Sequence, residues 1–198
     1  MRPFATRFFG LFLPLLLPPL LAASQAPPLR EECTSAIVPA IHAKGGSPLI
    51  WKNRDTDYLS NRLLFVPAQP YAYIGLSNRD NPSGDSVYGG LNSEGFGIIN
   101  TVGVNLPEAG PGEMKDLEGF MMADALRTCR TIEDFEAWLV ARLGPELGSQ
   151  ANFAVLDASG KALLFEIHNH GYRVIDPAVE PQAVLVNTNF SRSGAEGK

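Results

Sequence analysis

The cysteine at position 33 directly follows two glutamates and begins an apolar, β-branched run, CTSAIVPAI. A cysteine attacks as its thiolate, so it needs a base or an electropositive setting close by. The sequence pairs no histidine with Cys33. If the bond between Glu32 and Cys33 is cut, the new α-amine, with an ordinary pKa of about 8, lies on the same residue as the thiol and can serve as its base. Cys33 is therefore a candidate N-terminal nucleophile, in which one residue supplies both nucleophile and base.

Other kinds of site have little support in the sequence. The three histidines, His42, His168 and His170, have no cysteine or carboxylate at ligand spacing, so we expect neither a metal nor a cofactor. His168 and His170 are expected to share one face of one strand. The glycines of GGLNSEGFG have no helix after them to bind a phosphate, and the chain has no G-x-S-x-G motif. A nucleotide enzyme and a classical serine hydrolase are therefore not expected.

Composition and charge point to one globular domain that does not bind nucleic acid. The chain has 198 residues, of which 45% are hydrophobic, and this suits a single domain with a substantial core. Its formal net charge is −5, and no Lys/Arg cluster offsets this value. Nucleic-acid binding relies on basic patches. A nucleic-acid partner is therefore not expected.

The first 24 residues have the order of a secretory signal peptide: two arginines, an apolar stretch at 8–21, and small residues at 22–24. Three prolines interrupt the apolar stretch. It is also short for the roughly 20 residues of a spanning helix, so an uncleaved anchor is the less favoured interpretation. Residues 25–32 form a short spacer or propeptide. We expect residues 1–24 to be removed and the protein to be exported to the periplasm or the cell exterior, with no membrane span remaining.

Two cysteines, Cys33 and Cys129, would then lie in an oxidising compartment, where an even number of cysteines invites a disulfide. A structural secreted domain held by a Cys33–Cys129 disulfide is therefore one alternative. Cys129 lies on the apolar side of an expected helix, where it is most simply a buried thiol.

The periodicity of the remaining chain indicates an α+β layered fold with a mainly antiparallel sheet. Thr131, three residues before Asp134, is typical of the N-cap of a helix. Apolar residues three and four apart favour helices at 116–129 and 131–144. The expected strands occupy 34–43, 48–55, 62–66 and 71–76, two more flank a turn at 92–95, two flank a turn at 157–161, and a last one occupies 183–191.

Five motifs follow one another along the chain: CTSAI, WKNRDTD, GGLNSEGFGIINT, NFAVLDASGKALLFEI and VLVNTNFS. Together they resemble the N-terminal nucleophile hydrolases that use a cysteine, which include the penicillin acyltransferases, the choloylglycine (bile salt) hydrolases, the penicillin V acylases and acid ceramidase. The likeness is greatest to the autoproteolytic acyltransferases that act on linear amide C–N bonds. It implies a four-layer αββα fold over 33–198 and self-cleavage between Glu32 and Cys33. It also implies hydrolysis or N-acyl transfer of a small-molecule amide through a thioester on Cys33.

The resemblance also implies roles for individual residues. Asp55, in KNRD, matches the aspartate that holds the α-amine of the nucleophile, and a carboxylate there would fix the orientation of the amine. Asn189, in NTNFS, matches an asparagine of the oxyanion or amine network near the nucleophile. An amide donor of this kind is what a developing oxyanion needs. The second donor of the family falls on Asn100 or Thr101, at the end of GFGIINT.

Two features depart from the pattern of the family. The bile salt hydrolases carry an arginine three residues before the aspartate, where this chain has Lys52, and Arg54 stands beside the aspartate instead. A lysine lacks the planar bidentate fork of arginine, so we expect Lys52 and Arg54 to bind the acid end of the substrate in another way. Members of the family also continue past this length, so we expect 33–198 to be the N-terminal part of a longer, C-terminally incomplete domain.

Two alternatives stay open. Asp55 and Asp57 follow an expected strand, where aspartates commonly form turns. The chain could also be a catalytically inactive or truncated binding domain of the same fold, in which case an exposed apolar face is expected.

Overall fold

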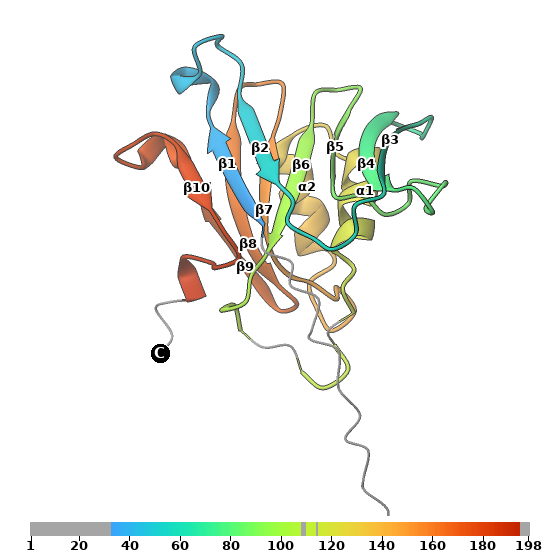
Figure 1. Ribbon diagram of the computed structural model, residues 1–198. Coiled ribbons are helices and arrows are strands. Elements are labelled where there is room, and N and C mark those ends of the chain that lie inside the picture. Colours follow the sequence, from blue (N-terminus) through green and yellow to red (C-terminus); the bar gives the residue numbers. More distant parts are fainter. Residues whose placement is uncertain (1–32, 108–109, 114, 195–198) are drawn as a thin grey trace, which may run out of the picture.

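The computed structural model describes residues 33–107, 110–113 and 115–194. These residues form three stacked layers: a pair of helices, a seven-stranded sheet and a three-stranded sheet (Figure 1). Every pair of neighbouring strands is antiparallel. The expected α+β class with mainly antiparallel sheets is therefore confirmed. The expected signal peptide (1–24) and spacer (25–32) lie outside the described residues.

The three-stranded sheet has the strand order β10–β1–β2. β1 (Thr34–Val38) and β2 (Leu49–Asn53) form the hairpin expected around the glycine turn, and their connection contains one turn of 3₁₀ helix, Ala40–His42. β10 (Leu185–Asn187) comes from the other end of the chain and pairs with β1. The first and last described strands therefore lie side by side.

The seven-stranded sheet runs from β3 to β9 in sequence order, because each strand turns back beside the one before it. Its central strands are covered on both faces. In β7, Phe153 packs in the core beneath the helices and Ala154 packs in the core between the two sheets. A strand buried on both faces has no solvent-facing side, and this explains the continuous apolar run FAVL at 153–156. The strands are β3 (Asn61–Val66), β4 (Tyr73–Asn78), β5 (Gly89–Asn92), β6 (Gly97–Val102), β7 (Gln150–Leu156), β8 (Ala162–His168) and β9 (Gly171–Ile175).

The helices α1 (Glu118–Thr128) and α2 (Ile132–Val140) pack on the seven-stranded sheet around Phe135. The ring of Phe135 is fully buried and meets Phe165 of the sheet edge to face, at 5.1 Å between centroids. Thr131 and Asp134 form a reciprocal capping box at the start of α2, as expected from the sequence. In the part of the chain that the structure describes, no helix is both long enough and apolar enough to cross a membrane.

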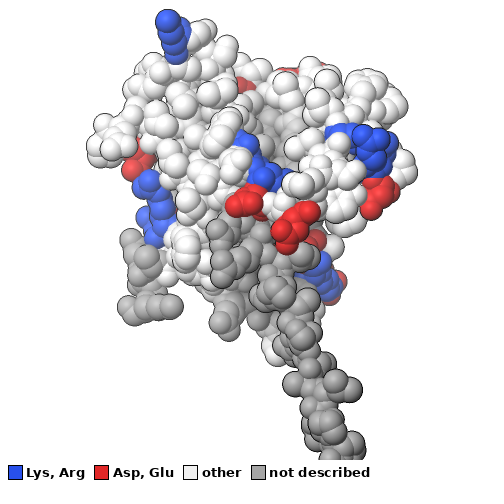
Figure 2. Space-filling model, in the orientation of Figure 1, with Lys and Arg blue, Asp and Glu red and all other residues white. Residues whose placement is uncertain are grey.

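The outer face of the three-stranded sheet is apolar and exposed. Leu49, Trp51 and Val186 are 55%, 52% and 59% exposed. Trp51 and Val186 stand on either side of Ala36 in the strand register, so Trp51, Ala36 and Val186 share one face of the sheet. The surface over β1 and β2 carries few charged side chains in Figure 2. The four-layer fold implied by the resemblance places helices over this sheet, whereas the described residues form three of the four layers.

One expectation about the sheet is wrong. His168 ends β8, and Gly171, directly opposite it, begins β9, so Asn169 and His170 form a two-residue turn. The two histidines therefore do not share a face of one strand. Asn169 favours turns, and here its buried side chain also accepts a hydrogen bond from the backbone N–H of Ser149, which stabilises the turn at this point.

Candidate active site

Cys33 lies immediately before β1 and is 5% exposed. Its backbone nitrogen donates a 3.1 Å hydrogen bond to Oδ1 of Asn189. The register of the sheet explains this contact: Ser35 opposes Asn187, so the residues two positions further out on the two antiparallel strands meet. The structure thus places Asn189 at the nitrogen that would become the α-amine after cleavage. Glu32, on the other side of the expected scissile bond, lies outside the described residues.

Cys33 lines a pocket of about 140 Å³ between the two sheets and the start of α1. The pocket lies where β6 continues past the start of β5. Gly89, the first residue of β5, pairs with Ile99, so the last residues of β6 pair with β7 alone. Four other expected site residues line the same pocket: Lys52, Arg54, Asn100 and Thr101. The remaining lining residues are Ser86, Val87, Tyr88, Val102, Asp116, Glu118, Gly119 and Met122.

Lys52 joins the two sheets across the pocket. It stands opposite Ser35 in the hairpin of β1 and β2, and its side chain reaches the seven-stranded sheet. Its Nζ donates a 2.9 Å hydrogen bond to Oδ1 of Asn100 and a 3.4 Å hydrogen bond to the carbonyl oxygen of Tyr88. The ammonium group of Lys52 therefore contacts one of the two candidate oxyanion donors directly.

Arg54 lies flat against an aromatic ring at the pocket wall. Its guanidinium carbon is 3.4 Å from the ring centroid of Tyr88, which is a cation–π contact. Its Nη1 donates to the carbonyl oxygen of Tyr58 at 3.1 Å and to Oδ1 of Asn61 at 3.2 Å. These contacts hold a permanent positive charge in the lining of the pocket.

Thr101, the other candidate oxyanion donor, has its hydroxyl group engaged in a buried network. Its Oγ1 donates to the carbonyl oxygen of Thr188 at 2.8 Å. The same oxygen accepts hydrogen bonds from Nδ2 of Asn152 at 3.3 Å and from Nδ2 of Asn187 at 3.2 Å. A hydroxyl has one proton to donate, so Thr101 has no free side-chain donor.

Asp55 differs from most of the other expected residues in that it does not line the pocket. Exposure alternates along β2 and continues just past its end, so that Asn53 and Asp55 are exposed while Lys52 and Arg54 are partly buried. Neither Asp55 nor Asp57 is among the described residues that line the pocket. The role of Asp55 toward the α-amine stays a prediction.

Glu118 is a pocket residue that the sequence reasoning missed. It begins α1, is 6% exposed, and its Oε1 accepts a 3.0 Å hydrogen bond from the backbone N–H of Gln150. Its Oε2 is buried without a hydrogen-bond partner among the described residues. Burial, with a smaller contribution from the nearby carboxyl group of Asp116, raises the pKa of Glu118 to about 7. The helical spacing could have indicated this burial, because Glu118 is four residues before Met122, which is buried on the same face of α1.

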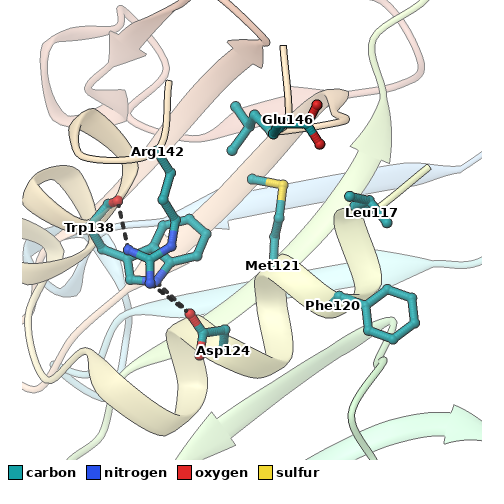
Figure 3. Close-up of a pocket in the computed structure, with 8 residues that line it drawn as sticks. Leu117, Phe120, Met121, Asp124, Trp138, Arg142 and Glu146 are labelled. Carbon is teal, nitrogen blue, oxygen red and sulfur yellow. Dashed lines mark hydrogen bonds and ion pairs between the residues drawn. The ribbon is translucent and has the colours of Figure 1, made fainter. Parts of the chain in front are cut away.

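A second and larger pocket lies on the helix layer and has different chemistry (Figure 3). It has a volume of about 410 Å³ and is lined mainly by apolar side chains. Three of its polar groups pair with one another, because Asp124 accepts hydrogen bonds from Nε1 of Trp138 at 2.8 Å and from Nη2 of Arg142 at 3.2 Å. Its lining contains no cysteine or histidine. The smaller pocket at Cys33 is therefore the better candidate for catalysis.

Both cysteines are free thiols, which contradicts the alternative of a Cys33–Cys129 disulfide. Cys129 is the C-cap residue that follows α1 and is 1% exposed, and burial raises the pKa of its thiol to about 11. Such a thiol is protonated at neutral pH and is a poor nucleophile. Among the described residues, no group of three or more His, Cys, Asp or Glu side chains could hold a metal ion.

Comparison by sequence finds no family model and no curated protein that matches this chain. Comparison by structure finds relatives of known fold. A mutant of the conjugated bile acid hydrolase from Clostridium perfringens aligns with a TM-score of 0.54 and 17% identity, over 77% of this chain and 52% of that one. An N-acylethanolamine-hydrolyzing acid amidase ortholog from Caenorhabditis elegans aligns with a TM-score of 0.53 and 15% identity, over 84% of this chain and 74% of that one.

The chain spans about half the length of the bile acid hydrolase that it matches. Both proteins are members of the N-terminal nucleophile hydrolase superfamily. At these identities the likeness establishes the fold alone. The fold implied by the sequence motifs is therefore confirmed for the part of the chain that aligns.

Proposed function

We propose that this protein is an exported cysteine hydrolase or N-acyltransferase that cuts itself between Glu32 and Cys33 and then acts on linear amide bonds. One observation carries the proposal: the nitrogen of Cys33 is held by Asn189 beside a pocket that also contains two cationic side chains and an asparagine amide. Two proteins of the same fold are named for the hydrolysis of bile acid conjugates and of N-acylethanolamines. Export rests on the sequence of residues 1–24.

Maturation would use the thiol of Cys33. Its Sγ attacks the carbonyl carbon of Glu32, the peptide C–N bond breaks, and the nitrogen of Cys33 takes up the thiol proton. Water then hydrolyses the resulting thioester, which releases the spacer with a free carboxylate and restores the thiol. The new α-amine keeps Oδ1 of Asn189 as a hydrogen-bond acceptor.

Turnover would use the same sulfur with the α-amine as base. The amine takes the thiol proton as Sγ attacks the substrate carbonyl, and it gives that proton to the leaving nitrogen as the amide C–N bond breaks. The products of this step are a thioester on Cys33 and a free amine. Water completes hydrolysis, and a second amine completes acyl transfer.

Asn100 is the better of the two candidate oxyanion donors. The hydroxyl proton of Thr101 is already donated to Thr188, whereas the Nδ2 group of Asn100 belongs to a side chain that lines the pocket. An amide donor fixed in a small pocket stabilises the charge that develops on the carbonyl oxygen of the substrate. Arg54, held over Tyr88, supplies a charge for the acid end of the substrate.

The first test is the N-terminus of the purified protein, determined by intact mass and N-terminal sequencing. We expect the wild-type protein to begin at Cys33 and the Cys33→Ala variant to retain the spacer. Cys129→Ala is the matched control and is expected to mature normally, because Cys129 is buried in the core beneath the helices and does not line the pocket. An active wild-type protein that keeps REEC intact would exclude the mechanism.

The second test is amine release from a panel of linear N-acyl amides, with hydroxylamine added to trap the acyl group. We expect wild type and Cys129→Ala to release amine and to form the acyl hydroxamate, and Cys33→Ala to do neither. Amine release by Cys33→Ala at the wild-type rate would show that another residue carries the reaction.

A binding domain without catalysis is a second candidate, and the exposed apolar face of the three-stranded sheet favours it. In that case the protein would fold with its spacer attached and release no amine from any substrate of the panel. The two tests above therefore separate this candidate from the enzyme.

A further inference from the structure

We propose that Lys52 is a positioning residue that acts through Asn100 and is not a ligand of the substrate. Its ammonium group holds the side-chain amide of Asn100 in the orientation that presents Nδ2 to the catalytic pocket. The inference rests on the proposed function, since it concerns how the oxyanion of that reaction is stabilised.

The position of Lys52 follows from the gap in the seven-stranded sheet. Gly89 pairs with Ile99, so a longer β5 would place Tyr88 opposite Asn100. β5 begins only at Gly89, and the ammonium group of Lys52 bonds to both sides of this gap. It contacts the carbonyl oxygen of Tyr88 at 3.4 Å and Oδ1 of Asn100 at 2.9 Å.

The hydrogen-bonding chemistry of the two groups then determines the orientation of the amide. An ammonium group has donors and no acceptor, so Asn100 must turn its oxygen toward Lys52. The reversed amide would place its NH2 group against the ammonium group, and both groups are donors. The observed contact therefore keeps Nδ2 of Asn100 on the side away from Lys52, available as a donor.

The charge of Lys52 has a second effect on the same amide. A cation bound to the amide oxygen draws electron density from the amide nitrogen, which strengthens its N–H groups as donors. A donor fixed before the reaction stabilises an oxyanion without reorganisation during the reaction. Lys52 should therefore contribute to the rate of the chemical step and little to substrate binding.

The use of the lysine protons supports this assignment. Two of the three N–H donors of the ammonium group are directed at Tyr88 and Asn100. Arg54, in contrast, lies flat on the ring of Tyr88 at the pocket wall. The two cations that the sequence predicts as substrate ligands would then have different tasks, with Lys52 orienting Asn100 and Arg54 binding the substrate.

A double-mutant cycle on the matured enzyme tests the proposal. We expect Lys52→Met to lower kcat about 10- to 100-fold with little change in KM, and Asn100→Ala to lower kcat about 100- to 1000-fold. The double variant should be no slower than Asn100→Ala, because Lys52 acts only through Asn100. Lys52→Arg should restore most of kcat, since its guanidinium group can donate to the same oxygen.

Lys161→Met is the matched control, because it removes an exposed ammonium group that is ion-paired with Glu133 outside the pocket. It should leave kcat and KM unchanged. A rise in KM at constant kcat in Lys52→Met would make Lys52 a substrate ligand and overturn the proposal. A loss of kcat in the double variant equal to the product of the two single losses would overturn it as well.

If Lys52→Met matures slowly, the rate of self-cleavage replaces kcat in the same double-mutant cycle, because cleavage also forms an oxyanion.

A measurement without substrate separates this inference from the proposed function. The side-chain NH2 signals of Asn100, assigned by their loss in Asn100→Ala, should move in the nitrogen–proton correlation spectrum of Lys52→Met and stay in place in Lys161→Met. Signals that do not move would exclude the contact even in an active enzyme. A shift in a protein that cleaves no amide would leave the contact intact and remove the proposed function instead.

Discussion

Asn100 and Thr101 are neighbours on β6, yet their side chains point to opposite faces of the strand and have different surroundings. Asn100 contacts Lys52, whereas the hydroxyl group of Thr101 bonds to Thr188, Asn152 and Asn187. One residue therefore belongs to the pocket chemistry and the other to the buried network that joins β6 to the last strand.

Asn100→Ala and Thr101→Val should consequently affect different properties, the first kcat and the second the free energy of unfolding. We expect Asn100→Ala to lose kcat and to keep its stability. Thr101→Val should lose about 1–3 kcal/mol of unfolding free energy, because two buried amides lose their acceptor, and should keep most of kcat. Urea unfolding together with amine-release kinetics measures both effects. A large loss of kcat in Thr101→Val at wild-type stability would reverse the assignment of the donor.

Glu118 should make stability depend on pH. Burial, helped by Asp116, raises its pKa from the ordinary 4.5 to about 7, so the folded protein holds a proton that the unfolded chain releases. Its contribution to stability is undiminished below about pH 4.5, falls as the pH rises to about 7 and is constant above, with a total loss on the order of 3 kcal/mol.

Glu118→Gln tests this pH dependence, because it keeps an acceptor for the N–H of Gln150 and carries no charge. Urea unfolding of both proteins from pH 4.5 to 8 should show the variant gaining stability over wild type as the pH rises. A difference that is independent of pH would contradict the raised pKa.

At the scale of elements, the first turn of α1 is held against the segment that precedes β5. The backbone N–H of Val87 donates to the carbonyl oxygen of Gly119 at 3.1 Å. A Cβ atom on Gly119 would lie 2.2 Å from Oγ of Ser86 and 3.3 Å from the carbonyl oxygen of Val87. All three residues line the pocket at Cys33, so this close approach forms part of its wall.

Gly119→Ala should therefore push α1 away from Ser86. We expect a loss of about 1–3 kcal/mol in unfolding free energy from overpacking, together with lower amidase activity. Gly45→Ala is the matched control, because a Cβ atom there meets no atom within 4 Å. Thermal and urea unfolding compare the two variants. Equal stability of both would show that the Ser86 hydroxyl group or the helix moves aside without cost.

At the scale of the whole molecule, the exposed sheet face should promote association. Leu49, Trp51 and Val186 stand on the outer face of the three-stranded sheet, and clustered apolar side chains of this kind are unusual on a monomer surface. We expect the apparent molar mass of the matured protein, measured by light scattering, to rise with concentration. The double variant Trp51→Ser, Val186→Thr should weaken this association.

Ile41→Ser is the control for association, because Ile41 is 80% exposed but lies in the connection between β1 and β2 and not in the sheet. Its apparent molar mass should rise with concentration as that of the wild-type protein does. A wild-type protein that stays monomeric at every concentration would show that this face does not associate.

Local sequence signals predicted the elements, and the resemblance carried by the ordered motifs predicted five of the residues that line the pocket: Cys33, Lys52, Arg54, Asn100 and Thr101. The two helices, the capping box at Thr131 and the hairpin of β1 and β2 follow from periodicity and turn chemistry, which act over a few residues. His168 and His170 show the limit of such signals, because alternation along a strand does not reveal where the strand ends. The ordered motifs also singled out Cys33 as a candidate nucleophile.

Only the tertiary structure decided how these residues meet. Cys33 and Asn189 are 156 positions apart and touch because β10 returns beside β1. The sequence allowed either Asn100 or Thr101 as the donor, and the network around Thr101 distinguishes them. The raised pKa of Glu118 exists only once other elements bury its carboxyl group. Composition and periodicity act along the chain, whereas burial, register and hydrogen-bond partners depend on distant segments, so they arise only when the layers pack.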